Sequence, residues 1–287
     1  MSALSNILGY ILNFIYTFVH NYGLALILFT LLIKLILLPI SLKQQKTMKK
    51  SSKIQVELKE IQEKYKNDQV KANQEMMNVY KRENMSPMSG CLSSIIQIIL
   101  LFAVFYLVRS PLTYMKKVDP QVIDQYKQEI AEESTTQSAY PEVQIIKEKG
   151  PSDERVYVNM NFLGLDLSSV PQANLTDYKV YIIPALYIIS SIASMKLTLP
   201  PKAKKEKIEE VEENEKTRED KDDDSASPEE SMENMSRTMS FMIPIMAVSI
   251  SLVAPLGLAL YWLVNNISMI VERVCINKFM KDEEEKA

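Results

Sequence analysis

NYGLALILFTLLIKLILLPISLKQQKTM, at residues 21–48, is the stretch that decides the fold class of this 287-residue chain. Between residues 22 and 42 it holds a single charged side chain, Lys34, among residues that are otherwise almost all apolar. A helix needs about 20 such residues to cross the hydrocarbon core of a bilayer. Residues 22–42 therefore predict a first transmembrane helix, which a basic segment follows.

Four later segments are also apolar and long enough to cross a membrane, at residues 91–109, 179–199, 238–254 and 255–275. Pro255 and Gly257 separate the last two, and both residue types favour a tight turn between helices. Charged residues gather between these segments, and a bilayer requires such segregation. We expect an all-α integral membrane protein with five transmembrane helices.

The segment before the first span, residues 1–21, has polar or small residues at spacings of three and four. This spacing forms a stripe along one side of a helix. We therefore expect an amphipathic helix that lies in the membrane interface on the external side. A cleaved signal peptide is the alternative, but the segment has neither a basic start nor a small-residue cleavage site. The residues of the stripe are Ser2, Asn6, Gly9, Asn13, Thr17 and His20.

Basic residues near the span ends predict the orientation, because cytoplasmic loops are enriched in Lys and Arg. Between residues 43 and 82 there are eleven Lys or Arg against five Asp or Glu. We expect this segment in the cytoplasm, the N-terminus outside, and the C-terminal tail at 276–287 inside. The remaining connections become an external loop at 110–178 and a cytoplasmic loop at 200–237. The acidic part of that loop, residues 206–233, predicts disorder.

The cytoplasmic segment 43–90 has two runs of apolar residues with helical periodicity, on either side of Asn67 and Asp68. Two amphipathic helices with a short connection predict an antiparallel helical hairpin. The first run is Ile54, Leu58, Ile61 and Tyr65, and the second is Ala72, Met76 and Val79.

Lys34 is the first candidate for a functional residue. It lies twelve residues into the first span, which is about 18 Å along a helix. A charge exposed to lipid at that depth costs at least about 2.5–3.5 kcal/mol. We therefore expect Lys34 to face a polar, partly hydrated cavity without an obvious charged partner, with Thr30 on the same side of the helix. Snorkelling of the side chain toward the cytoplasmic interface is the alternative.

Polar side chains in the other spans are further candidates for this cavity. Gln97, Asn265 and Asn266 are costly in lipid, so we expect them in the interior of the bundle. Ser190 and Ser194 have two interpretations, because serines also let membrane helices approach closely.

Five motifs follow one another along most of the chain. They are residues 21–48, LKEIQEKYKND at 58–68, QEMMNVYKRENMSPMSGCLSSIIQ at 74–97, FLGLDLSSVP at 162–171 and PLGLALYWLVNNI at 255–267. Together they resemble the YidC/Oxa1/Alb3 family of membrane protein insertases, in the bacterial form without a large external domain. Ser93 departs from the family, which commonly has proline there, and the short acidic tail at 281–287 does not match a basic ribosome-binding tail.

The resemblance implies five core helices around a hydrophilic groove that opens to the cytoplasm and to lipid and carries one positive charge. Lys34 matches that charge. Gln97 and Trp262 match positions in or near the groove, although Trp262 also suits anchoring at the external interface. The residues expected at the groove are Lys34, Thr30, Gln97, Ser190, Ser194, Trp262, Asn265 and Asn266.

The resemblance also implies a function: an insertase or chaperone, not an enzyme, in the plasma membrane of a bacterium. The expected partners are nascent membrane proteins and the lipid bilayer, with the Sec translocon and the ribosome as further candidates and no specific nucleic acid. The hairpin would capture substrates through Ile61, Met76, Met77 and Tyr80. We expect no cofactor or metal, because the chain has one histidine, His20, and no glycine-rich phosphate loop.

Two alternatives from other classes remain open. A small-solute transporter or channel would have internal repeats or broken helices in paired positions. An intramembrane peptidase would use a Ser–Lys pair, with Lys34 as the base and a serine such as Ser194 as the nucleophile.

Overall fold

The computed structural model describes residues 2–66, 68–85, 89–133, 138–198, 246 and 248–284. This part of the chain is helical with almost no sheet. Its helices are α1 (Ser2–Val19), α2 (Tyr22–Lys64), α3 (Gln69–Arg82), α4 (Ser89–Arg109), α5 (Pro120–Glu133), α6 (Pro141–Glu148), α7 (Ile182–Thr198) and α10 (Leu256–Glu284). The shorter elements are the π-helix η1 (Leu112–Lys116), the 3₁₀ helices η2 (Pro171–Ala173) and η3 (Tyr178–Tyr181), and the strands β1 (Asn161–Phe162) and β2 (Leu165–Asp166).

Two stretches of the described helices are long and apolar enough to cross a membrane, Tyr22–Thr47 and Leu256–Ile276. Shorter apolar helical stretches are Ala3–Val19, Ile98–Arg109 and Tyr178–Ser194. The predicted acidic segment 206–233 and most of the predicted fourth span, 238–254, lie outside the described residues.

Helix α2 joins the first predicted span and the first arm of the predicted hairpin in one continuous helix of 43 residues. The Asn21 side chain caps its start by accepting a hydrogen bond of 3.0 Å from the Leu24 amide. The sequence predicts a boundary between span and hairpin near residue 42, whereas the helix continues past that residue. Lys, Gln and Glu follow residue 42, and these residues have high helix propensity, so the change from apolar to charged sequence does not interrupt the backbone.

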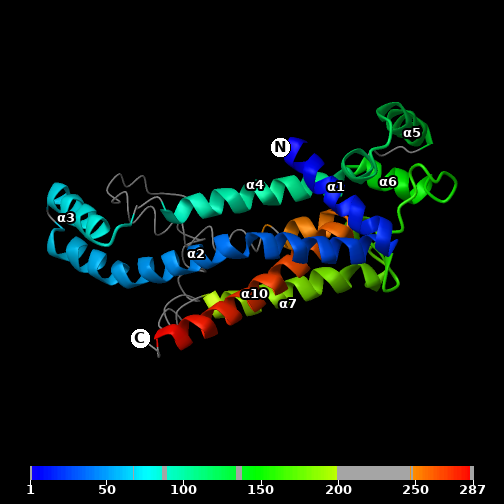
Figure 1. The fold of residues 1–287 in the computed structure, drawn as a ribbon. Coiled ribbons are helices and arrows are strands. Elements are labelled where there is room, and N and C mark those ends of the chain that lie inside the picture. Colours follow the sequence, from blue (N-terminus) through cyan, green and yellow to red (C-terminus); the bar gives the residue numbers. More distant parts are fainter. Residues whose placement is uncertain are drawn as a thin grey trace.

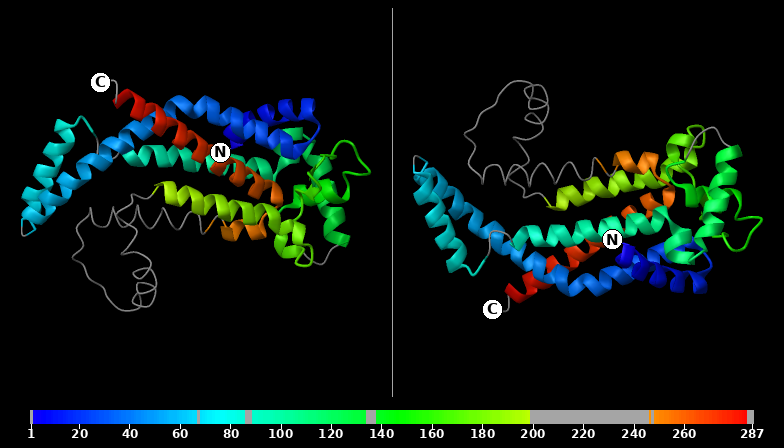
Figure 2. Two further views of the ribbon diagram at one scale, coloured as in Figure 1. Left: turned by 90° about the horizontal axis from the view of Figure 1, so that it is seen from below. Right: turned by 90° about the horizontal axis from the view of Figure 1, so that it is seen from above.

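Helices α2, α4, α7 and α10 run along the long axis of the molecule, with α3 at one end and α5 and α6 at the other (Figure 1). The two further views in Figure 2 show the same separation of the ends. The bundle shares one hydrophobic core, and its largest fully buried side chains include Tyr22, Phe29, Leu107 and Leu256.

At one end of the bundle, α3 folds back on the second half of α2 as an antiparallel hairpin (Figure 1). The Asp68 side chain caps α3 by accepting a hydrogen bond from the Lys71 amide. Apolar side chains from both arms form a separate core, which consists of Ile54, Leu58, Ala72, Met76 and Val79.

Helix α1 packs on the bundle through its small and apolar residues. Ser5 is fully buried and donates a hydrogen bond of 3.0 Å to the Ala103 carbonyl of α4. Gly9 lies against η1 so closely that a Cβ atom there would be 2.0 Å from the Tyr114 carbonyl oxygen. The opposite side of α1 exposes an apolar row of Ile7, Tyr10, Phe14 and Phe18. Part of the predicted polar stripe therefore contacts protein, because small residues permit close helix contact.

The segment between α4 and α7 forms a folded cap over the starts of α2 and α10. The Tyr22 amide donates to the Asn159 carbonyl at 3.0 Å, and the Gly257 amide donates to the Leu167 carbonyl at 3.0 Å. Within the cap, the buried Glu142 carboxylate accepts from the amide of Thr113 at 2.9 Å and from its hydroxyl at 2.7 Å. These bonds hold the first residues of α2 and α10 at the same end of the molecule.

Candidate functional site

A small cavity lies between α2, α4 and α10, and Lys34 is the basic residue in its lining. Its volume is about 10 Å³, which is about the space that one water molecule needs. Helix α2 contributes Phe29, Thr30, Ile33, Lys34 and Leu37, helix α4 contributes Leu100 and Val104, and helix α10 contributes Tyr261 and Asn265.

The polar groups of the cavity come from two neighbouring helices. Thr30 is buried and donates its hydroxyl to the Leu26 carbonyl of its own helix at 2.7 Å, so its polar group is already satisfied. Lys34 follows one turn later on the same side of α2. Asn265 is half-buried and approaches from α10. Three of the eight predicted groove residues, Lys34, Thr30 and Asn265, therefore line one cavity.

Glu272 of α10 is a residue that the sequence analysis missed. It lies close enough to Lys34 for the two charges to interact electrostatically. Its Oε1 atom is buried and has no hydrogen-bond partner among the described residues. The expectation that Lys34 has no charged partner was therefore wrong. Glu272 falls inside the predicted fifth span, 255–275, and an acidic residue within a span is a signal that could have revealed it.

A second polar cluster joins α10 to α7 away from the cavity. The Asn266 side-chain amide donates to the Ser190 hydroxyl at 3.0 Å and to the Ser191 hydroxyl at 3.2 Å. Ser190 in turn donates to the Tyr187 carbonyl at 2.8 Å. All three polar side chains are buried, so the hydrogen bonds replace the water that these groups lack.

Trp262 belongs to the same α7–α10 interface. Its ring centroid lies 6.1 Å from that of Tyr187, and its Nε1 atom is buried without a hydrogen-bond partner among the described residues. Ser194 is half-buried on α7 and is not part of the cavity lining. Gln97 lies on α4, but its side chain is outside the described part of the structure. Three of the predicted groove residues therefore line the Lys34 cavity, and three others, Ser190, Asn266 and Trp262, lie at the α7–α10 interface.

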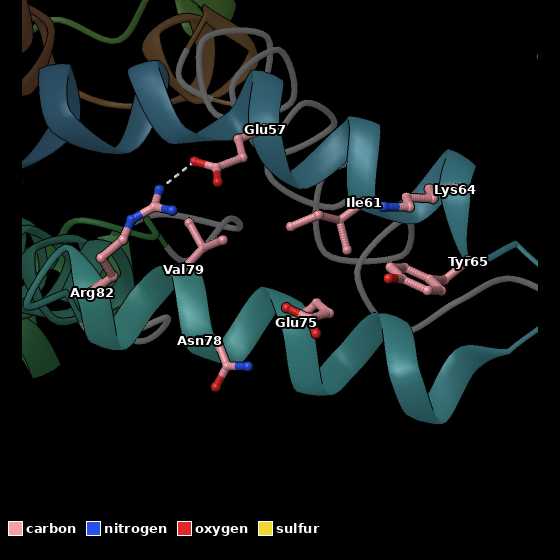
Figure 3. Close-up of a pocket in the computed structure, with 8 residues that line it drawn as sticks. All are labelled: Glu57, Ile61, Lys64, Tyr65, Glu75, Asn78, Val79 and Arg82. Carbon is pink, nitrogen blue, oxygen red and sulfur yellow. Dashed lines mark hydrogen bonds and ion pairs between the residues drawn. The ribbon is translucent and has the colours of Figure 1, made fainter.

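The hairpin carries a larger and more open hollow, with a volume of about 420 Å³ (Figure 3). At one end of it, Arg82 and Glu57 form an ion pair of 2.5 Å, and Lys64 and Tyr65 lie at the other end. Ile61 is a half-buried apolar residue of the lining. Its other lining residues are Glu75, Asn78 and Val79.

The residues predicted to capture substrates differ in exposure. Met77 is 45% exposed on α3, whereas Met76 is 3% exposed and lies in the core of the hairpin. The Met76 sulfur accepts a weak hydrogen bond of 3.7 Å from the Gln62 side chain. Tyr80 is half-buried and packs against the same core. Met76 therefore offers no surface to a partner while the two arms are packed together.

Among the described residues, no group of three or more His, Cys, Asp or Glu could hold a metal ion. The chemistry available at the Lys34 cavity is therefore that of one ammonium group with hydroxyl, amide and carboxylate neighbours on apolar helices. Such a site can attract negative charge in a medium that screens it less than bulk water does. A chain with membrane-length apolar helices and a half-buried lysine among them has the features of a helical membrane protein.

The family follows from comparison with known proteins. A family model described as "60Kd inner membrane protein" matches residues 14–284, which is most of the chain. The chain belongs to this family, which is the YidC/Oxa1 family. The resemblance that the sequence motifs indicate is thereby confirmed.

Several relatives carry the name "Membrane protein insertase YidC". The one from Treponema denticola is 27% identical over 282 residues, which are 98% of this chain and 38% of that relative. The one from Fusobacterium nucleatum is 41% identical over 109 residues, which are 38% of this chain and 53% of that relative. The one from Chlorobaculum parvum is 49% identical over 100 residues, which are 35% of this chain and 17% of that relative. The matches thus span well under two thirds of the relatives' own lengths.

Proposed function

We propose that this protein is a membrane protein insertase, which moves newly made proteins from the cytoplasm into the bilayer. The observation that carries the proposal is the half-buried lysine of α2, which lines a cavity with Thr30 and Asn265. The name of the relatives supports the same function.

In this proposal the five spans are α2, α4, α7, residues 238–254 and α10, and they surround a hydrophilic groove. The groove opens to the cytoplasm and to lipid, and the cap between α4 and α7 closes it on the external side. The excess of basic residues between 43 and 82 supports a cytoplasmic hairpin and an external N-terminus. The membrane would be the plasma membrane of a bacterium.

The physical task is to carry a short polar tail of the substrate across about 30 Å of hydrocarbon. A groove that reaches mid-membrane shortens this path, and Lys34 attracts acidic residues of the tail by Coulomb attraction. The apolar helix of the substrate then leaves along the spans into lipid. Burial of its apolar surface supplies the driving force, at about 0.025 kcal/mol per Å².

The hairpin would act first, as the surface that captures the substrate. Its exposed Met77 and the hollow beside Ile61 offer adaptable apolar contacts, and methionine surfaces suit varied partners. The partners in this account are nascent membrane proteins and lipid, with the Sec translocon and the ribosome as further candidates.

The test is insertion of a single-span substrate into proteoliposomes, read out as protection of its tail from added protease. We expect wild type and Lys34→Arg to insert the substrate and Lys34→Ala to lose most of the activity. Lys127→Ala, which removes an exposed lysine of the cap, is the matched control and should behave as wild type. Insertion no better than in empty liposomes by wild type would refute the function. Solute flux in substrate-free vesicles would instead favour a transporter.

A further inference from the structure

The cavity-facing side of α10 continues beyond the cavity to an acidic residue. Tyr261 and Asn265 line the cavity, and Glu272 follows Asn265 by seven residues. Seven residues are about two helical turns, so Glu272 lies on the same side of α10 as Asn265. Arg273, the next residue, points about 100° away around the helix.

The depth of Glu272 can be compared with that of Lys34, because α2 and α10 start side by side. A Cβ atom on Gly257 would lie 3.3 Å from the Tyr22 ring, so these two residues lie near each other at the cap end of the helices. Lys34 comes twelve residues after Tyr22 and Glu272 fifteen residues after Gly257, which correspond to about 18 Å and about 22 Å along the helices. Glu272 is therefore about one turn farther from the cap than Lys34.

The environment of Glu272 leaves one of its oxygens without a fixed partner. Its Oε1 atom is buried and makes no hydrogen bond to the described residues. A buried charge is costly unless an opposite charge compensates it. Lys34, on the facing side of α2, is the cation positioned to do so.

We propose that Glu272 is the resident counter-charge of Lys34 and that an acidic substrate tail has to replace it there. This inference rests on the insertase function proposed above. It adds a residue that sets the preference for acidic over neutral substrate tails. In the substrate-free protein, Glu272 compensates the lysine charge in the apolar bundle. During insertion, Asp or Glu residues of the tail compete with Glu272 for Lys34, and a neutral tail does not.

A tail therefore has to bind Lys34 more favourably than Glu272 does, because specificity is a difference between two affinities. Glu272 lowers the affinity of Lys34 for acidic tails and leaves neutral tails unaffected. Replacing it with the isosteric neutral Gln should therefore increase the advantage of acidic tails over neutral ones.

The first test measures insertion of two substrates that differ only in an acidic or a neutral tail, at limiting protein in proteoliposomes. In Glu272→Gln we expect the acidic-to-neutral ratio of insertion to rise about three- to tenfold over wild type, a tenfold change being about 1.4 kcal/mol. The matched control Glu132→Gln, an exposed residue at the end of α5, should keep the wild-type ratio. In the double variant Lys34→Ala/Glu272→Gln the rise should disappear. An unchanged or lower ratio in Glu272→Gln overturns the proposal, even when wild type inserts both substrates.

A second test needs no insertion activity and uses thermal stability in detergent. We expect Lys34→Glu and Glu272→Lys each to lower the melting temperature, because each brings like charges together. The exchanged pair Lys34→Glu/Glu272→Lys should recover much of the loss. If the two losses simply add, the residues do not interact and the proposal falls. Failure of wild type to insert either substrate would refute the insertase function, and this cycle would still decide whether the two charges are paired.

Discussion

The hydrogen bonds between Asn266 and the serines of α7 predict a measurable loss of stability when they are removed. Asn266→Ala deletes two donors, at 3.0 Å from the Ser190 hydroxyl and 3.2 Å from the Ser191 hydroxyl. Hydrogen bonds between membrane helices contribute on average about 0.6 kcal/mol each, with a maximum near about 1.7. Two such bonds and the lost packing give an expected cost of about 1–2 kcal/mol. For a chain of this size that cost lowers the melting temperature by about 2–8 °C.

The assay is thermal unfolding in detergent micelles, followed by the fluorescence of Trp262. This residue is the only tryptophan in the chain and lies at the same interface, beside Tyr187. Ser268→Ala is the matched control, because the Ser268 hydroxyl bonds to the Val264 carbonyl of its own helix. It should change the melting temperature little.

A double-mutant cycle decides whether the loss comes from these bonds. Asn266→Ala and the pair Ser190→Ala/Ser191→Ala should each destabilise the protein, and the triple variant should lose less than their sum by at least about 0.5 kcal/mol. Strict additivity would refute the reasoning, because the asparagine and the serines would then act independently.

Three other predictions concern helix α1, the hairpin and the cap. Gly9→Ala should detach α1 from η1 at a cost of about 1–3 kcal/mol, because the new Cβ would lie 2.0 Å from a backbone oxygen. Thermal unfolding measures this loss of stability. It should be smaller for Gly257→Ala, where the nearest contact is a side chain at 3.3 Å. Met76→Ala should destabilise the hairpin by about 2–5 kcal/mol and speed the hydrogen exchange of α3. The control is Met77→Ala. If α3 exchanges as slowly in Met76→Ala as in this control, the burial of Met76 is contradicted. Hydrogen bonds from Arg155 and then Tyr126 hold the pKa of Asp153 below its ordinary value of 3.8, so Asp153 stabilises the cap above that value and the contribution disappears as the pH falls through the lowered pKa. The rate at which pepsin cleaves the cap should therefore rise more in wild type than in Asp153→Asn as the pH falls. Identical pH profiles of the two proteins would contradict this.

The sequence predicts the elements of the bundle well where apolar periodicity is strong. The helical class and the family are confirmed, and both rest on residues 21–48 and the motifs that follow. Periodicity reveals which residues share a side of a helix, as for Ile54 and Leu58, which the structure buries in the hairpin. It does not reveal where a helix ends when charged residues of high helix propensity follow an apolar run. Helix α2 therefore extends through residue 42 to Lys64.

The candidate site is predictable in part. A single lysine in an apolar span singles out Lys34, because the cost of a charge in lipid does not depend on the rest of the fold. Its neighbours depend on the rotation of α10, which sequence alone leaves open. Asn265 and Asn266 illustrate this, since adjacent residues point about 100° apart. Asn265 lines the cavity, and Asn266 bonds to α7. Glu272 is visible in the sequence as an acidic residue within a predicted span, but its place near Lys34 depends on how α10 packs on α2.

In the proposed function, the charge of Lys34 attracts the opposite charge of the substrate tail. The most direct measurement compares insertion of substrates with acidic and basic tails, in proteoliposomes that contain wild type, Lys34→Arg or Lys34→Glu. We expect wild type and Lys34→Arg to favour the acidic tail and Lys34→Glu to favour the basic tail. If all three proteins show the same preference, Lys34 does not interact with the charge of the tail, which would contradict the proposed role of this lysine.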